Sequence, residues 1–309
     1  MTLTFEDAKA ICRSLILDLP RLKDAKPDDL YYAMKKLLAI HDHLVEEAAR
    51  VTNALHAHLM QHYPNYQRFF RRLDGRVALA FFERFPSPRA LLSETEESLA
   101  DFLREKRYPG RYLEKARQIL SAARESGWTT SPLQDAHDEV TRSCVRRLMH
   151  LKEEIRRVKA ALERLVYASP YPNLLTMPGI SIVTAAAIIA YIGDVSRFRS
   201  ADQVAKYAGI CPVSFSSGER ISHRRNRYGK RRLNHAFYML AVQHVATDRD
   251  GNPRNPLMYA YYQKKLAEKE PEHRHRAMVY VMRRLVNIVF RMMKTGSPYR
   301  EPATENGSS

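Results

Sequence analysis

Two long stretches of regularly spaced apolar residues constrain this chain more than any other feature of its sequence. In residues 28–60 and again in residues 138–167, apolar and histidine side chains recur at alternating steps of four and three. This spacing puts them on one face of an α-helix and is typical of a coiled-coil seam. Asp28 and Asp29 suit the start of the first helix, and prolines follow the end of both. The seam positions are Leu30, Met34, Leu37, His41, Leu44, Ala48, Val51, Leu55 and His58, then Cys144, Leu148, Leu151, Ile155, Val158, Leu162 and Leu165.

The two seams have similar lengths, which suggests either an antiparallel hairpin within one chain or a coiled coil that dimerises. Two helices of an ordinary bundle would show the same pattern. We favour the coiled coil and, with it, a homo-oligomer. Shorter helical patterns lie between the seams, including one over 77–85, and no segment is clearly rich in strand pattern. We therefore expect a mainly α fold.

The charge balance narrows the function. The 309 residues include 51 Lys and Arg against 34 Asp and Glu, a formal net charge of +17. Because 45% of the residues are hydrophobic, the chain can bury a core, and wholesale disorder is excluded. So large a positive surplus indicates a polyanionic partner, most often nucleic acid. The alternative is a generally basic, solvated surface.

The cysteines and the apolar runs indicate the compartment. The 3 cysteines are far apart and odd in number, which excludes a disulfide framework and a cysteine-built zinc site. No apolar run approaches the ~18–20 residues of a membrane span. The N-terminus lacks the layout of a signal peptide. We expect a soluble intracellular protein without a membrane partner.

Residues 174–190 contain a Met-Pro-Gly-Ile turn followed by a run of small and apolar residues. Gly179 allows a backbone conformation that a side chain would resist. It also lets the following helix present its N–H groups to a phosphate. We therefore expect a helix-hairpin-helix-like element that grips a nucleic-acid backbone without reading bases. A tight helix–helix turn without a ligand is the alternative.

A Ser216-Ser217-Gly218 sequence follows in what we expect to be a loop. A serine hydroxyl before glycine can serve as a nucleophile on an exposed turn. From spacing alone a solvated turn is the better interpretation, since serine and glycine are common turn residues.

A concentrated basic run begins directly after this serine pair. Residues 219–233 hold seven cations and one acid, with Tyr228 among them. Arginine side chains suit phosphate contacts, and a tyrosine can stack on a base. We expect phosphate binding here, with a strong dependence on salt. The cations are Arg220, Arg224, Arg225, Arg227, Lys230, Arg231 and Arg232.

In their order and spacing, the motifs between Leu174 and Leu233 resemble the transposases of insertion-sequence family 110. The resemblance is carried by Leu-x-x-Met-Pro-Gly-Ile, residues 198–212, Ser217-Gly218 and residues 225–228. It implies a recombinase that moves DNA elements under the guidance of a structured bridge RNA. In that family an N-terminal RNase H-like domain carries four acidic metal ligands, and the C-terminal domain carries a nucleophilic serine.

The resemblance also implies residue roles. Ser217 is the implied nucleophile, with Ser216 as the alternative because the local alignment is ambiguous by one residue. It would attack a phosphodiester and form a covalent link to DNA. Arg220, Arg225 and Lys230 would then hold phosphates or stabilise the charge that develops on the attacked phosphate.

The resemblance is weakest at the N-terminus. Mg²⁺ is the cofactor expected for the family, and Asp7 matches its last acidic ligand, whereas Thr4 stands where the preceding acid occurs. One carboxylate cannot hold two divalent cations. We therefore expect a truncated, catalytically impaired copy, from a decayed element or a misplaced start codon.

These observations predict four regions and a function. A remnant of the catalytic domain with its linker (1–27) precedes a helical and coiled-coil region (28–170), the transposase domain (171–296) and a disordered tail (297–309). The predicted function is DNA transposition or site-specific recombination, with DNA, a structured guide RNA and a second copy as partners. The alternative is a non-catalytic nucleic-acid-binding remnant that partners full-length copies. A coiled-coil scaffold without affinity for nucleic acid is the third possibility.

Overall fold

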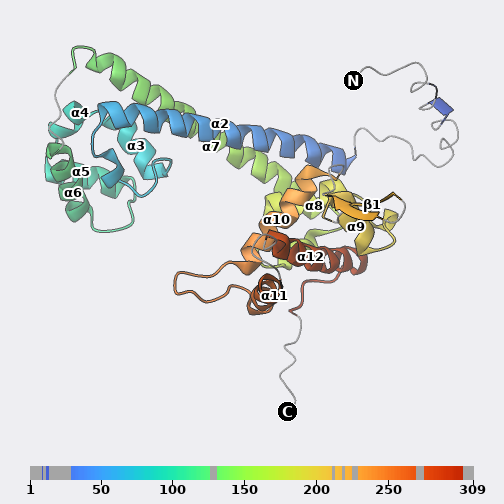
Figure 1. The fold of residues 1–309 in the computed structure, drawn as a ribbon. Coiled ribbons are helices and arrows are strands. Elements are labelled where there is room, and N and C mark those ends of the chain that lie inside the picture. Colours follow the sequence, from blue (N-terminus) through green and yellow to red (C-terminus); the bar gives the residue numbers. More distant parts are fainter. Residues whose placement is uncertain are drawn as a thin grey trace.

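Two long helices form an arm that connects two helical bodies (Figure 1). Helix α2 (Leu30–His62) leads away from the C-terminal body, and α7 (Gln134–Ala168) returns beside it. Asp29 caps α2, since its Oδ1 accepts a hydrogen bond of 2.6 Å from the backbone N of Tyr32. The computed structural model describes residues 29–125, 131–210, 213–217, 220–224, 229–268 and 275–301, together with residues 9, 12 and 13.

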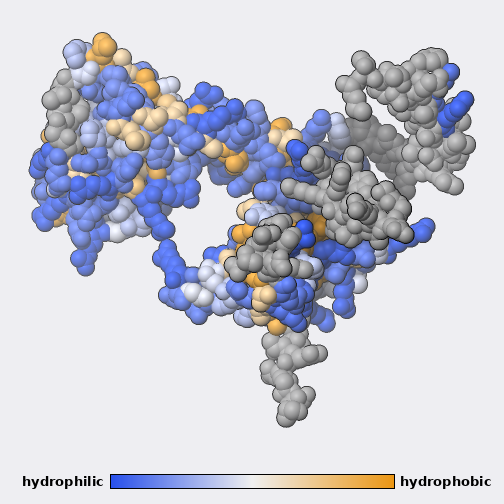
Figure 2. Space-filling view, in the orientation of Figure 1, coloured by the Kyte–Doolittle hydropathy of each residue, from blue (hydrophilic) through white to orange (hydrophobic). Residues whose placement is uncertain are grey.

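The arm pairs the two predicted seams within one chain, which is the hairpin alternative. Leu38 and Leu162 are buried toward the C-terminal body, and Leu55 and Leu148 are buried toward the other. Some buried positions differ from the predicted ones: Leu38 is buried and Leu37 only partly so, because a helix drifts relative to a seven-residue repeat. Hydrophilic residues cover most of the visible face of the arm (Figure 2). The homo-oligomer stays a prediction.

The distal body, residues 63–124 with the far ends of α2 and α7, has a core of aromatic rings. Tyr63, Phe69, Phe81 and Phe82 are fully buried there. The predicted helix over 77–85 is confirmed. The elements are η2 (Tyr66–Arg68), α3 (Arg76–Arg84), α4 (Pro88–Leu92), α5 (Glu96–Glu105) and α6 (Tyr112–Arg124).

The C-terminal body, residues 171–299 with the near ends of α2 and α7, is built around α8 (Ile182–Ile192). Residues 185–190 are buried without interruption, so α8 lies inside a layer of other helices. Their alanines allow close helix–helix approach. The surrounding elements are η3 (Pro172–Thr176), η4 (Val195–Arg197), α9 (Ala201–Ala208), α10 (Arg231–Val245), α11 (Pro256–Ala267) and α12 (His275–Thr295).

A β-hairpin interrupts this otherwise helical body. Strands β1 (Val213–Ser217) and β2 (Arg220–Arg224) pair antiparallel. The expectation of a loop at Ser216 and Ser217 was therefore wrong, because both residues lie in β1. Valine, phenylalanine and isoleucine alternate with polar residues here, a strand pattern that the surrounding arginines obscure. The prediction of a mainly α fold is confirmed.

The prediction of a disordered tail over residues 297–309 was wrong for the first of these residues. The backbone N of Tyr299 donates to Thr176 Oγ1 at 2.8 Å, and Asn173 Nδ2 donates to the Ser297 carbonyl at 2.8 Å. These bonds tie the chain after α12 back to η3, and residues 302–309 lie outside the described residues.

Across the residues that the structure describes, no helix combines the length and apolarity needed to cross a lipid bilayer.

Candidate nucleic-acid interface

Two glycines bring the ends of the hairpin segment together. Helix α9 ends at Gly209, whose φ of 75° is left-handed. A Cβ added to Gly229 would lie 2.3 Å from Gly209 Cα, so only glycine fits at this crossing. The backbone N of Lys230 donates to the Tyr207 carbonyl at 2.9 Å. The chain therefore leaves α9 and enters α10 at one point.

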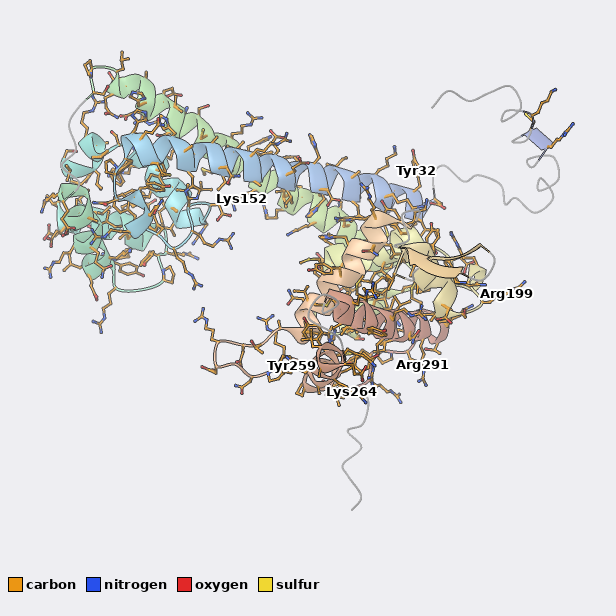
Figure 3. All side chains as sticks on the ribbon, viewed as in Figure 1. Tyr32, Lys152, Arg199, Tyr259, Lys264 and Arg291 are labelled. Carbon is orange, nitrogen blue, oxygen red and sulfur yellow. The ribbon has the colours of Figure 1, made fainter. Side chains whose placement is uncertain are left out.

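Cations surround this crossing. Lys230 Nζ lies 5.8 Å from the centroid of the Tyr207 ring, and Arg197 Cζ lies 5.1 Å from the same centroid. These cation–π contacts hold both charges near one aromatic ring while their side chains stay exposed. Figure 3 shows Arg199 at the same end of the body as the hairpin. The exposed cations, which we call the hairpin-base surface, are Arg197, Arg199, Lys206, Lys230 and Arg231.

Arg232 is committed to a different contact. Its guanidinium makes a 2.8 Å ion pair with Asp42 of α2, and its side chain is 21% exposed. His41 beside them is buried, which lowers its pKa, although the neighbouring Asp42 carboxylate opposes that shift. Arg232 therefore fastens α10 to the arm, and we leave it out of the hairpin-base surface.

The serine pair lies at the tip of the hairpin, away from its base. The first pair of the ladder is Val213 with Arg224, and the last is Ser217 with Arg220. At ~3.3 Å per residue, the four steps along β1 separate Ser217 from Val213 by roughly 13 Å. Ser216 pairs with Ile221. Of the predicted cations, Arg225 and Arg227 lie outside the described residues, as does the predicted metal ligand Asp7.

The turn at Gly179 has the conformation that the sequence predicted. Its φ is +83°, and a Cβ there would lie 3.1 Å from the Cβ of Gln243 on α10. Ser181 caps the following helix, because its Oγ accepts from the backbone N of Thr184 at 3.2 Å. The cap occupies one N–H group that a phosphate would need, and the element before the turn is the 3₁₀ helix η3. The helix-hairpin-helix-like element and its phosphate contact stay predictions.

Comparison with known proteins shows which family the region with these features resembles. Residues 171–263 match the model of the family described as Transposase IS116/IS110/IS902 family. Residues 171–263 are therefore similar to the transposases of that family. The match spans α8 to most of α11 and includes both strands, the glycine crossing and the hairpin-base surface.

Longer relatives extend the similarity beyond residues 171–263. The Streptomyces coelicolor "Insertion element IS110 uncharacterized 43.6 kDa protein" is 27% identical over 281 residues, 89% of this chain and 67% of the relative. The Mycobacterium paratuberculosis "Insertion element IS900 uncharacterized 42 kDa protein" is 27% identical over 306 residues, 96% of this chain and 73% of the relative. The "Pilin gene-inverting protein" of Moraxella lacunata is 28% identical over 162 residues, 49% of this chain and 47% of the relative.

The sequence analysis gave no role to three cations of the matched region. Arg197 and Arg199 flank Phe198, and Lys206 precedes Tyr207, so cations alternate with aromatic residues before the hairpin as well as after it. This alternation is a signal for nucleic-acid contact. It was missed because the two segments join the basic run only through the crossing of Gly209 and Gly229.

The described residues do not fit the Mg²⁺ expected for the family. Among them, one group of three or more side chains could hold a metal ion: His58, His62 and His137 on the arm. Imidazoles suit zinc and similar transition metals, whereas Mg²⁺ prefers oxygen ligands. We therefore assign no step of the reaction to Mg²⁺ on these residues.

Proposed function

We propose that this chain binds and rejoins DNA as part of a transposase or site-specific recombinase. The family match over residues 171–263 carries the proposal, because it coincides with the body that holds the hairpin. Two kinds of relative support it: insertion-element proteins and a protein described as inverting a pilin gene. Both kinds of name point to DNA rearrangement.

In this proposal the hairpin-base surface binds DNA phosphates. Lys230 and Arg231 begin α10, and no side chain caps that helix, so its first N–H groups can donate hydrogen bonds to a phosphate. The glycine crossing places Arg197 and Lys206 of the preceding segment beside them. Such contacts position the DNA and supply affinity without reading its sequence.

The hairpin tip carries the proposed chemistry. We assign the nucleophile to Ser217 ahead of Ser216, because Ser217 pairs with Arg220 in the ladder while Ser216 pairs with an isoleucine. The serine Oγ loses its proton and bonds to phosphorus, and the bond from phosphorus to one deoxyribose oxygen breaks. That oxygen takes up a proton, and Arg220 stabilises the charge of the transition state.

DNA binding is tested with a double variant of the hairpin base. Lys230→Ala with Arg231→Ala should weaken binding of random duplex DNA and reduce the slope of log affinity against log salt by about 2, or ~1 for each lost phosphate contact. The matched control is Arg50→Ala with Arg164→Ala, which removes two exposed arm cations. Equal losses of DNA affinity in both variants would contradict the assignment.

Binding of a hairpin RNA in the same assay tests the guide-RNA partner that the resemblance implies.

The nucleophile is tested by trapping a covalent adduct. The full chain is incubated with magnesium, DNA that spans the ends of its own genetic element, and the transcript that flanks its gene. We expect a detergent-resistant protein–DNA band that Ser217→Ala abolishes and Ser216→Ala retains, with DNA affinity unchanged in both. Loss of the band only in Ser216→Ala would move the nucleophile by one residue. Absence of any adduct in the unaltered chain would favour the non-catalytic nucleic-acid-binding remnant.

A further inference from the structure

Three histidines meet at the far end of the arm, away from the C-terminal body. His58 and His62 are one turn apart on α2, and His137 faces them from the first turn of α7. One ring nitrogen from each lies within 4.8 Å of the others, and all three side chains are partly buried. The rings of His62 and His137 stack with centroids 3.7 Å apart. The cluster therefore lies between the end of α2, where the chain enters the distal body, and the start of α7, where it leaves that body.

The hydrogen bonding of His58 leaves one of its ring nitrogens able to bind a metal ion. Its Nε2 lies 3.0 Å from the carbonyl oxygen of His137, and a carbonyl can only accept, so Nε2 carries the proton. Nδ1 then keeps a lone pair. Metal-bound histidines commonly donate their other ring N–H to such a partner, which fixes the ring orientation.

The cluster also favours neutral imidazoles, the form that binds metals. Burial lowers the pKa of His62, and the nearby His137 and His58 lower it further. Burial likewise lowers the pKa of His58, against the opposing effect of its bond to the His137 carbonyl. Four ligands at ~2.0–2.1 Å around zinc lie roughly 3.4 Å from one another, so the three nitrogens must move closer together. The stacked rings of His62 and His137 must also turn until their lone pairs converge on the ion.

We propose that His58, His62 and His137 form a site for a zinc-like transition-metal ion that clamps α2 to α7. A fourth position stays open to water, as in other three-histidine zinc sites. The ion closes the chain segment between His62 and His137, which contains residues 63–124 of the distal body, and so restricts that segment in the unfolded state. Its binding needs no nucleic acid.

Calorimetric titration of Zn²⁺ into the metal-free full chain tests the site. We expect one ion per chain and, with Co²⁺, the intense visible absorption of tetrahedral coordination. His62→Gln and His137→Gln should each lose more than the ~10–100-fold in affinity that follows removal of a partner outside the coordination shell. Mg²⁺ should not bind there, since imidazoles do not suit it.

Two matched controls separate this site from weak surface binding. His43→Gln and His150→Gln remove exposed histidines from the same two helices and should bind Zn²⁺ like the unaltered chain. Far-ultraviolet circular dichroism checks that each variant folds, and zinc should raise the thermal midpoint of the unaltered chain but not of His62→Gln. No saturable binding, or equal losses in the controls, would overturn the proposal and leave a stack of neutral rings.

Discussion

The two bodies at the ends of the arm are packed by different means. In the distal body, aromatic rings meet edge to face, as Phe81 does with Phe82 at 5.2 Å and Phe85 with Phe102 at 5.4 Å between centroids. In the C-terminal body, a helix of alanine and isoleucine lies at the centre, and glycines permit the closest backbone approach. One core fills its space with large side chains, and the other brings backbones together.

The two bodies also differ in how far apart in the sequence their contacting residues are. The distal body consists mainly of one continuous stretch, residues 63–124, closed by the ends of the arm. The C-terminal body joins residues near 34, 166, 190, 240 and 289 in one core. Close backbone crossings are what place the cations of separate segments around the hairpin base. The family match accordingly falls on this body.

The largest expected effects come from truncating one core residue in each body. Phe82 and Ile188 are both 0% exposed. Phe82→Ala should cost about 3–5 kcal/mol and Ile188→Ala about 2–5 kcal/mol of the free energy of unfolding. We expect Phe82→Ala to unfold the distal body with DNA binding retained, and Ile188→Ala to reduce DNA binding. Urea unfolding by circular dichroism, run beside the DNA-binding assay, measures both.

The same pair of variants can break the comparison. If Phe82→Ala abolishes DNA binding as fully as Ile188→Ala, the two bodies form one cooperative unit. Their different packing would then have no consequence for function.

An intermediate effect is expected at the glycine crossing. Gly229→Ala should cost about 3 kcal/mol, the upper part of the range for overpacking, because the added Cβ meets backbone that cannot move aside. DNA affinity should fall with it. The control, Gly251→Ala, adds a Cβ in open space at a φ of +85° and should cost only about 1–2 kcal/mol. Urea unfolding compares them, and equal costs would show that close approach at the crossing is unimportant.

The smallest effect concerns an ion pair between the distal body and the arm. Burial alone would raise the pKa of the Asp74 carboxyl, but hydrogen bonds from Arg72 and Lys152 lower it from 3.8 to about 2. Since the folded pKa is depressed, this stabilisation is present above pH 3.8 and is lost as the pH falls toward 2. Because its partners are substantially exposed, Asp74→Asn should cost only about 1 kcal/mol near neutral pH.

Urea unfolding between neutral pH and pH 3 checks this prediction. The difference between the unaltered chain and Asp74→Asn should shrink as the pH falls through this range. Asp101→Asn, which breaks an exposed pair with Arg104, is the control and should change stability by less than ~0.5 kcal/mol. A difference that stays constant with pH would place the effect in packing instead of charge.

The local pattern of the sequence determined the parts of the fold that depend on neighbours along the chain. The heptad spacing gave both arm helices, Asp29 marked the start of the first, and Gly179 required its left-handed turn. The charge of the segment around Lys230 pointed to phosphate. Helical periodicity, capping and turn geometry act over a few residues, so they can be recognised without the tertiary structure.

Only the tertiary structure decided which cations share a surface and which are paired. Arg231 and Arg232 are adjacent in sequence, yet one is exposed and the other makes an ion pair with Asp42, because successive residues of a helix face different sides. The contact between Gly209 and Gly229 and the meeting of His62 with His137 join distant segments. Such contacts depend on how the helices pack, and nothing in the local sequence of either partner specifies the other.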